Sequence, residues 1–303
     1  MLQLLIAGLT VGSEYGLIAL GIHIILRATR VVNFAQGEFA IVGGLVALSC
    51  VDALHVSVWF GLVAATLAGA VLGLAFEALV LRPAARGGET GATIATIGAV
   101  FILLYGHALV PGWGSEGHVL PSFGGTNLVV PVAPLIDQSK GSGSPETVVN
   151  AQSLWVLGLL LVALAVLYLI FERTYYGKAI RAASDNPLGA RLIGIDVRSA
   201  RSISVALGIA LAAYGGTIIG PITLVGGAAG FALTIKAFVA AVLGGLDSPI
   251  GCVAGGLIVG LLEVFATLTV GNDAADPIVY ALLLVMLLVR PQGLFGRRDL
   301  VRD

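Results

Sequence analysis

The chain has 303 residues, of which 58 % are hydrophobic and only 11 % are charged, and its mean hydropathy is +1.02. Soluble domains carry about 25 % charged residues, so this composition excludes an ordinary soluble domain and indicates a lipid environment. The net charge is −1 and the basic residues are dispersed, which excludes the basic face that nucleic-acid binding requires. We expect one membrane domain over residues 1–303, surrounded by lipid and without a nucleic-acid partner.

Apolar runs close to the ~20 residues that cross a bilayer predict transmembrane helices, which satisfy their own backbone hydrogen bonds in lipid. The long runs are Leu4–Leu26, Val58–Leu81, Ala92–Val110, Leu154–Phe171, Ser202–Ile219, Ile250–Val270 and Ile278–Val289. Two further runs, Phe39–Val51 and Ala232–Leu243, are too short for an ordinary span and predict broken or re-entrant helices. The predicted fold is an all-α integral membrane protein, a polytopic helical bundle of about 8–10 transmembrane segments.

The placement of Arg and Lys predicts the orientation, because cytoplasmic loops retain positive charge. Apart from Lys140 and Lys236, every basic residue lies in one of these segments: Arg27 with Arg30, Arg82 with Arg86, 173–201, and 290–303. We expect those segments to be cytoplasmic and the polar stretch 111–152 to be extracytoplasmic. If both short runs cross the membrane, the N-terminus lies outside and the C-terminus inside. No basic residue precedes the first run, which also holds Glu14 and His23, and this favours a retained span over a cleaved signal.

Glycines recur four residues apart in several runs, a spacing that lets helix backbones approach closely in lipid. They are Gly8, Gly12 and Gly16, Gly69 and Gly73, Gly251 and Gly255, and Gly256 and Gly260. We expect tight packing within the bundle or against another membrane chain.

Two polar or glycine-rich junctions interrupt the apolar pattern. In the first, Asn33, Gln36, Gly37 and Glu38 either border a conduit at a helix break or form an ordinary turn with Glu38 at a helix N-terminus. The second, 244–251, includes Gly245 and Gly251 and is followed by a Gly-Gly-Leu sequence that is also found after the first. That similarity is a weak sign of an internal repeat.

Ionisable residues inside spans are costly and are candidates for function. Glu14 lies near the middle of the first run and Lys236 inside a short one, so they either pair or face a wet cavity. Glu77 and Glu263 lie nearer the ends of their runs and fit an interfacial position as well.

The basic segment 172–201 is patterned unlike a simple loop. Asn186-Pro187 breaks a first helical pattern, and Ala190, Ile193 and Ile195 give a second short element an apolar side. Two short helices at the membrane surface form either a docking site for a cytoplasmic protein or an anchor at lipid head groups.

The sequence contains no G-x-x-x-x-G-K-[ST], H-E-x-x-H or G-x-S-x-G motif, so we expect neither an ATPase nor another enzyme. The histidines are too scattered for a metal site, and Cys50 and Cys252 are isolated in apolar runs, where small core thiols are expected. No cofactor bound by this chain is expected.

Several motifs in chain order resemble the permeases of branched-chain amino acid ABC transporters. They are GLTVGS at 8–13, GLIALG at 16–21, VNFAQGE at 32–38, EALVLRP at 77–83, ATIG at 95–98, the segment 177–195, KAFVAAVLGG at 236–245, GGLIVGLLE at 255–263 and VRPQGLFG at 289–296. The resemblance covers nearly the whole chain. It differs at Gln36, where histidine is frequent in the family, at Glu14, where a small polar residue is usual, and at Pro249, which lies one place early.

The resemblance implies a multi-pass subunit of a bacterial-type cytoplasmic (inner) membrane. Its partners would be a second homologous permease, two cytoplasmic ABC ATPases that use ATP and Mg²⁺, and an extracytoplasmic solute-binding protein. The implied coupling-loop residues are Arg181, Ala183, Asp185, Pro187, Ala190, Gly194 and Ile195. The implied translocation path holds Asn33, Gln36, Gly37, Glu38, Gly245 and Gly251, to which the in-span residues Glu14 and Lys236 are added.

The expected function is import of branched-chain amino acids by alternating access, with ATP supplying the drive through the partner ATPases. Relatives of this family carry urea and short amides, so the same machinery with another small solute is the alternative. A self-sufficient secondary transporter that uses Glu14 and Lys236 as ion-coupling groups is a further alternative.

Overall fold

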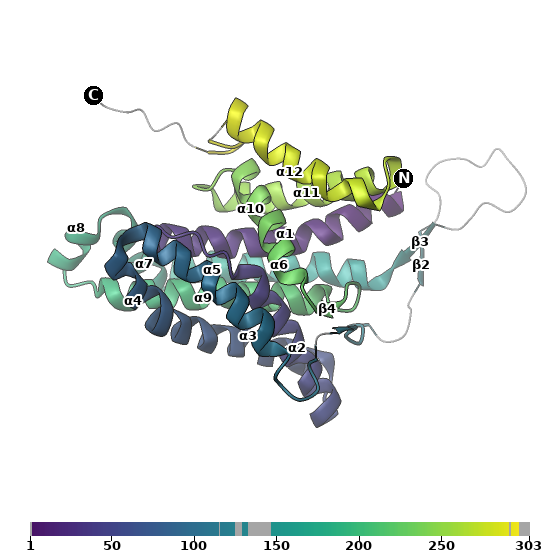
Figure 1. The fold of residues 1–303 in the computed structure, drawn as a ribbon, viewed down its shortest axis with the longest axis horizontal. Helices are drawn as coiled ribbons and strands as arrows, with labels where there is room; N and C mark the ends of the chain where they lie inside the picture. The colour runs from purple at the N-terminus through teal and green to yellow at the C-terminus, as the bar shows by residue number, and fades with distance from the viewer. Residues whose placement is uncertain (1, 115, 125–128, 133–146, 291, 297–303) are drawn as a thin grey trace, which may run out of the picture.

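The computed structural model describes residues 2–114, 116–124, 129–132, 147–290 and 292–296, and it is a bundle of long helices with two small β-ribbons (Figure 1). The helices are α1 Leu2–Thr29, α2 Gln36–Leu54, α3 Val58–Phe76, α4 Arg82–Ala84, α5 Gly88–His107, α6 Ala151–Arg173, α7 Tyr175–Asp185, α8 Pro187–Leu192, α9 Val197–Ile219, α10 Ala229–Gly244, α11 Pro249–Thr269 and α12 Asn272–Val289. A π-helical turn, Glu77–Leu81, follows α3, and a 3₁₀ turn, Ala85–Gly87, precedes α5. The strands are β1 Gly117–His118, β2 Val129–Val132, β3 Thr147–Asn150 and β4 Val225–Gly226, paired antiparallel as β1–β4 and β2–β3.

The predicted polytopic helical bundle is confirmed. Among the described residues, six helical stretches are long and apolar enough to cross a membrane: Leu2–Thr29, Gln36–Leu54, Val58–His107, Ala151–Arg173, Val197–Ile219 and Pro249–Thr269. The third is a 50-residue stretch that contains both α3 and α5, and two shorter apolar helices, Ala229–Gly244 and Ala274–Val289, accompany the six. The expectation that Phe39–Val51 is too short for a span is wrong, because α2 begins earlier, at Gln36, and ends at Leu54, giving 19 residues. The second short run remains short, at 16 residues in α10.

Helix α1 lies at the centre and packs against α11 through the predicted glycine rows. A Cβ atom added at Gly12 would lie 2.7 Å from both the Gly256 carbonyl oxygen and the Leu257 Cα, and one added at Gly8 would lie 2.8 Å from the Leu261 Cα. The two backbones therefore touch directly, which only residues without a side chain permit. The close packing is within this chain.

Helix α9 provides the second small-residue surface of the core. Gly69 and Gly73 of α3 pack against Ala213 and Ala206 of α9, where an added Cβ would meet atoms at 2.7 and 2.6 Å. Helix α2 approaches α9 in the same way, with Gly43 against Ala213. The spacing of glycines thus identified interfaces between helices far apart in the sequence.

The turn between α3 and α5 contains a buried acid. Glu77 is 1 % exposed, its carboxylate lies 2.7 Å from the Arg82 guanidinium and 3.9 Å from that of Arg201, and the Ser202 hydroxyl donates to it at 3.0 Å. Paired in this way, Glu77 ties the turn to the start of α9. Glu77 is thus buried and paired within the bundle rather than exposed on its surface.

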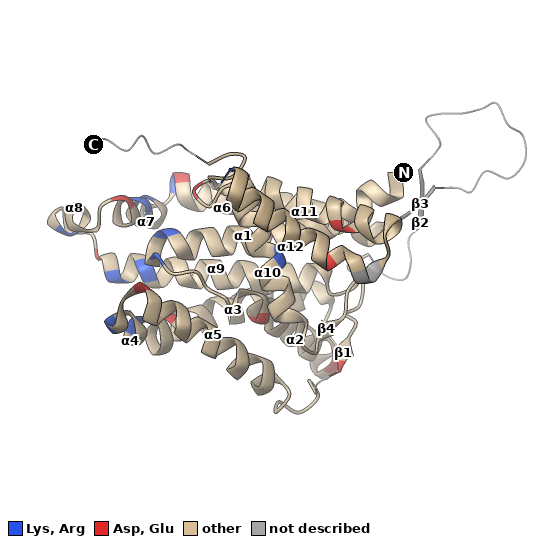
Figure 2. Cartoon of the chain, turned by 45° about the horizontal axis from the view of Figure 1, so that its top comes forward, with Lys and Arg blue, Asp and Glu red and all other residues tan. Residues whose placement is uncertain are grey.

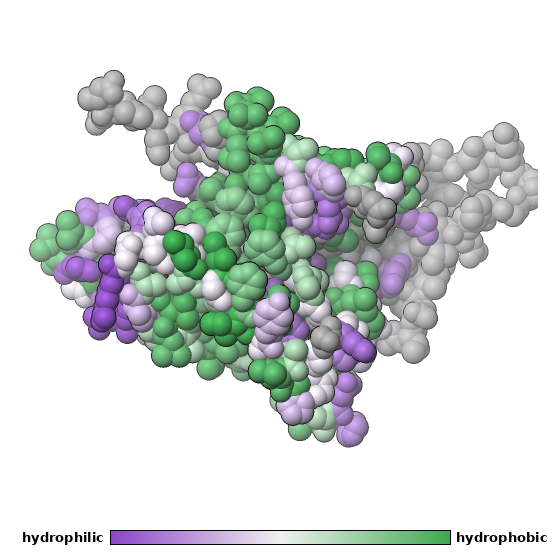
Figure 3. Space-filling model, in the orientation of Figure 1, coloured by the Kyte–Doolittle hydropathy of each residue, from purple (hydrophilic) through white to green (hydrophobic). Residues whose placement is uncertain are grey.

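The two ends of the bundle differ in charge. Lys and Arg gather at the end formed by α4, α7, α8 and the beginning of α9 (Figure 2), and the β-ribbons lie at the opposite end, where α1 begins (Figure 1). The surface between the ends is mostly hydrophobic (Figure 3). This is the pattern of a membrane-embedded body with one positively charged face. Much of the 111–152 segment, including Lys140, and most of the basic C-terminal stretch lie outside the described residues.

Candidate functional site

The first junction, residues 30–38, enters the interior of the bundle. Asn33 and Gln36 are fully buried, and the Asn33 side-chain amide donates to the Gln36 side-chain oxygen at 2.8 Å. The Gln36 amide donates in turn to the carbonyl oxygen of Gly208, halfway along α9, at 2.6 Å. The backbone N–H of Gly37 donates to the Thr234 hydroxyl of α10 at 2.8 Å. Glu38 lies in the first turn of α2, as the alternative of a turn with a helix N-terminal acid predicts. The junction is nevertheless buried, and its polar groups hold α2, α9 and α10 together.

We expect Gln36→Ala to lower the free energy of unfolding by about 1–3 kcal/mol, since it leaves the buried Asn33 amide without its acceptor and removes the side-chain hydrogen bond to the Gly208 carbonyl. Thermal unfolding of the purified protein in detergent measures the loss. Thr90→Ala, at an exposed position near the start of α5, is the control; if both variants unfold at the wild-type temperature, the hydrogen-bonded junction does not contribute as described.

Glu38, the last residue of this junction, lies in the first turn of α2 and faces the beginning of α10. It is 1 % exposed, and its carboxylate packs against Gly230, where an added Cβ would lie 2.5 Å from a carboxylate oxygen. The backbone N–H of Phe231 faces it from the first turn of α10, whose positive end favours an acid. Neither carboxylate oxygen makes a hydrogen bond of normal geometry to any described residue.

A polar cluster links α1, α10, α11 and α12. The Lys236 ammonium lies 2.9 Å from the Glu263 carboxylate and 2.7 Å from that of Asp276, and the Tyr15 hydroxyl donates to the other Glu263 oxygen at 2.6 Å. Lys236 therefore pairs with Glu263 and Asp276 rather than with Glu14. The Glu263 side chain is only 18 % exposed, and both its oxygens have partners within the bundle.

A cavity of about 190 Å³ lies among α1, α2, α9 and α10. Both Glu14 and Lys236 line it, as the alternative of a wet cavity predicts. Most of the remaining wall is aliphatic and includes Ala40, Ile41, Ile219, Val225 and Leu233. The arrangement combines a small apolar chamber with a few ionisable groups, the usual character of a small-solute site.

The second junction does not join this cavity. Gly245 ends α10 with φ +106°, a conformation that favours glycine, and packs against Gly293 and Gly296. The N–H groups of Leu294 and Phe295 donate to the carbonyl oxygens of Leu243 and Gly244. Of the predicted path residues, only Glu14 and Lys236 line the cavity. Its lining includes neither Gly245 and Gly251 nor the first-junction residues Asn33, Gln36, Gly37 and Glu38.

The 172–201 segment forms the two short helices that the sequence predicts. Asn186 separates them, and its side chain accepts a hydrogen bond from the N–H of Gly189 to cap α8. Helix α9 begins in the same way at Asp196, where hydrogen bonds from Ser199 and nearby N–H groups hold the pKa of the carboxyl below its usual value. The loop is thus folded into two capped helices rather than an irregular connection.

Some apolar residues in and around α8 are buried at the base of the loop, and others are exposed on its surface. Ala183 and Ala190 are buried with Ile180 and Ala200 at the base of the loop, so these two predicted coupling residues support it from inside. Ile193, expected on the same apolar side as Ala190, is exposed instead. The exposed apolar surface consists of Leu188, Leu192 and Ile193, at 73 %, 89 % and 75 % exposure. Gly194 follows with φ +84° and open space around it.

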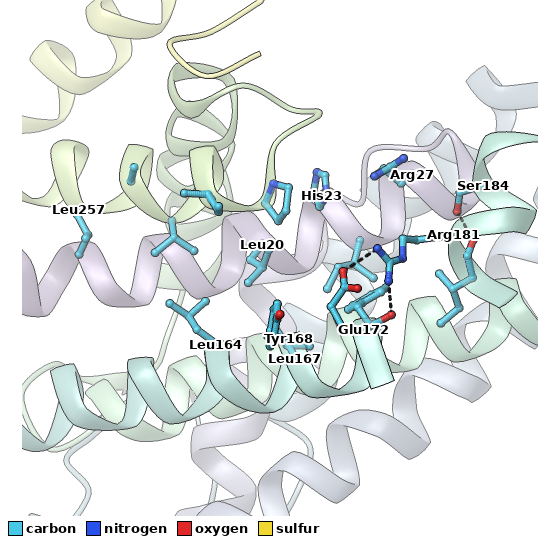
Figure 4. Close-up of a pocket in the computed structure, with 17 residues that line it drawn as sticks. Leu20, His23, Arg27, Leu164, Leu167, Tyr168, Glu172, Arg181, Ser184 and Leu257 are labelled. Atoms are coloured by element: carbon cyan, nitrogen blue, oxygen red, sulfur yellow. Dashed lines mark hydrogen bonds and ion pairs between the residues drawn. The ribbon is translucent and has the colours of Figure 1, made fainter. Parts of the chain in front are cut away.

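Two ion pairs connect α7 to long helices. Arg27 of α1 lies 2.7 Å from Asp185, and Arg181 lies 2.7 Å from Glu172 at the end of α6. Both pairs lie at one end of a groove of about 630 Å³ between α1, α6, α7 and α11, and Figure 4 shows Arg181 reaching Glu172 and the Phe171 carbonyl. A displacement of α7 would therefore act directly on α1 and α6.

Sequence reasoning missed Tyr15 and Asp276 as members of the polar cluster and Leu188 and Leu192 as exposed loop residues. Asp276 lies just outside the predicted last run, Ile278–Val289. Helix α12 begins at Asn272 and brings Asp276 beside Lys236. An acid two residues before an apolar run was the available signal.

Long apolar helices around a mainly aliphatic cavity with two ionisable groups, together with a structured two-helix loop at the basic end, define a polytopic membrane protein of the transport class. The chain belongs to the family described as branched-chain amino acid transport system / permease component, which matches residues 4–289. It is 29 % identical to the high-affinity branched-chain amino acid transport system permease protein BraD of Pseudomonas aeruginosa, over 98 % of this chain and 96 % of the relative.

Two further relatives agree. The high-affinity branched-chain amino acid transport system permease protein LivH of Escherichia coli is 30 % identical over 98 % of this chain and 96 % of its own length. A probable branched-chain amino acid transport permease protein LivH of Methanocaldococcus jannaschii is 30 % identical over 92 % and 88 %. No solved structure matches the chain.

Proposed function

We propose that this chain is a permease subunit of an ABC importer and forms, with a second homologous permease, the translocation path for branched-chain amino acids. The observation that carries the proposal is the similarity to branched-chain amino acid permeases, at about 30 % identity over 98 % of the chain. The central cavity supports it, because its wall is mainly aliphatic.

In this proposal the basic end of the bundle faces the cytoplasm. The start of α1 and the β-ribbons then lie on the outer side, where a solute-binding protein delivers the cargo (Figure 1). Two partner ATPases bind ATP and Mg²⁺ and dock on α7 and α8, with Leu188, Leu192 and Ile193 as the apolar contact. These side chains suit a protein partner better than lipid head groups, because they are apolar and highly exposed.

The mechanism is alternating access. Closure of the ATPase pair displaces α7 and α8, and the Arg27–Asp185 and Arg181–Glu172 contacts pass this movement to α1 and α6. Helix α1 lines the cavity with Glu14 and lies against α9, α10 and α11. A displacement of α1 opens the cavity to one side of the membrane and closes it to the other. The free energy for this change comes from the different affinities of ATP for the two ATPase arrangements.

We expect the double variant Leu188→Asp, Leu192→Asp to lose its ATPase partners while the chain remains folded, since both side chains are exposed and contribute little to the core. Affinity purification of the tagged chain from mild detergent, with the partners co-expressed, measures the retained ATPase. A loss of at least tenfold is expected.

Val119→Asp is the matched control, because Val119 is 59 % exposed and lies beside β1 at the opposite end of the bundle. It should retain the ATPases fully. Retention of the ATPases by the loop variant, or their absence from the wild-type preparation, would exclude α8 as the docking helix.

A further inference from the structure

The cavity between α1, α2, α9 and α10 has mostly aliphatic walls but is also lined by the ionisable residues Glu14 and Lys236. Its volume of about 190 Å³ is below the roughly 300–1,000 Å³ of drug-sized ligand sites, so it suits a solute of few heavy atoms. Lys236 is the one basic residue among its described lining residues. The Lys236 ammonium is already held by Glu263 and Asp276, which leaves the wall without a free cation.

Glu14 is the lining residue that lacks a partner. It is 6 % exposed and comes from the middle of α1, yet within the described part of the chain it makes neither a hydrogen bond nor an ion pair. A buried carboxylate without a partner is unfavourable, because it has lost its contact with water. An ammonium group that enters the cavity would stabilise this carboxylate by pairing with it. The geometry therefore leaves one acid aimed into an apolar chamber.

The surroundings strengthen this preference for positive charge. Glu38 is nearby on α2, buried against Gly230, which is the neighbour of the lining residue Ala229. Glu14 is the one carboxyl group among the described lining residues, while Glu38, Glu263 and Asp276 lie behind the wall, the last two paired with the Lys236 ammonium. A solute with an ammonium group is favoured here, and a solute whose only charge is negative is disfavoured.

We propose that Glu14 is a specificity-determining residue that binds the ammonium group of the transported solute, while Ile41, Ile219, Val225 and Leu233 contact its aliphatic side chain. This inference rests on the proposed function and adds that the permease has its own amine-selective site. Because Lys236 is already paired, the carboxylate of an amino acid is not what this site recognises. An aliphatic amine without a carboxylate should therefore bind, and the corresponding hydroxy acid should not.

The test uses the complete permease–ATPase complex, purified without its solute-binding protein. Thermal unfolding is followed with leucine, with leucinol, which keeps the ammonium but lacks the carboxylate, and with 2-hydroxy-4-methylpentanoate, which keeps the carboxylate but lacks the ammonium. A ligand that binds the folded complex raises its unfolding temperature in a concentration-dependent way. We expect leucine and leucinol to do so and the hydroxy acid to have no effect.

Glu14→Gln should abolish both shifts, and Glu14→Asp should retain a smaller one. Glu89→Gln is the matched control, because Glu89 is an exposed acid at the start of α5, away from the cavity, and its shifts should equal those of the wild type. Shifts that persist in Glu14→Gln, or a hydroxy acid that stabilises as leucine does, would overturn the assignment.

The outcome is separable from the proposed function. If ATP-driven leucine uptake by the complete importer is intact but Glu14→Gln binds and transports as the wild type does, the amine site alone is wrong. If the wild-type importer does not transport leucine at all, the proposed function fails first.

Discussion

Replacing Gly12 with Val is expected to prevent the folded protein from accumulating in the membrane. A Cβ atom at this position would lie 2.7 Å from the Gly256 carbonyl oxygen and 2.7 Å from the Leu257 Cα, and both are backbone atoms of α11 that cannot rotate away. Overpacking of a core typically costs about 1–3 kcal/mol, and separating two long helices should exceed that range. Fluorescence-detected size-exclusion chromatography measures the yield of monodisperse protein, which should fall more than tenfold.

The control for Gly12→Val is Gly158→Val in α6, where nothing lies within 4 Å of an added Cβ. It should express as the wild type does, because the new side chain projects from the exposed side of its helix. Equal yields of the two variants would show that α1 and α11 do not touch as described.

Lys236→Met is expected to have the second largest effect. Its ammonium joins the carboxylates of Glu263 and Asp276, and its own side chain is only 13 % exposed. Removing one partner of a buried ionic cluster leaves uncompensated charge and costs about 3–5 kcal/mol. We expect the free energy of unfolding to fall by about 3 kcal/mol, at the low end of this range because Asp276 is partly exposed. A lowered thermal unfolding temperature measures the loss.

A second substitution tests whether the loss in Lys236→Met comes from the unpaired carboxylates rather than from the changed shape of the side chain. Glu263→Gln in the Lys236→Met background removes one of the orphaned charges, so the double variant should be more stable than Lys236→Met alone. If the two effects simply add, the pairing of Lys236 with Glu263 does not carry the stability assigned to it.

Much of the fold could be predicted from the sequence because lipid restricts the solutions. Long apolar runs identified the helices, and glycines four residues apart identified surfaces such as the contact of Gly12 with α11. Hydropathy could not find where α2 begins, since it begins with polar Gln36 and Glu38, which other helices bury. The length of an apolar run therefore underestimates a helix whose polar end lies inside the bundle.

The site was predicted less completely, because the partners of an ionisable residue are fixed by packing. Glu14 and Lys236 were both recognised as costly in-span groups, and both line the cavity. Sequence alone could not show that Lys236 pairs with Glu263 and Asp276, because these two acids lie on other helices, α11 and α12. Gly245 and Gly251 were grouped with Asn33 and Gln36 because both junctions break a helix, but helix breaks occur at the end of the bundle as well as in its interior.

The central claim is that this chain imports branched-chain amino acids only as part of an ATP-driven complex. The most direct measurement is uptake of labelled leucine into proteoliposomes that contain the complex, with the solute-binding protein and leucine on the outer side and ATP with Mg²⁺ on the ATPase side. We predict uptake that requires ATP and is lost in the Leu188→Asp, Leu192→Asp variant. Leucine uptake by the chain alone, driven by a proton or sodium gradient and indifferent to ATP, would contradict the account.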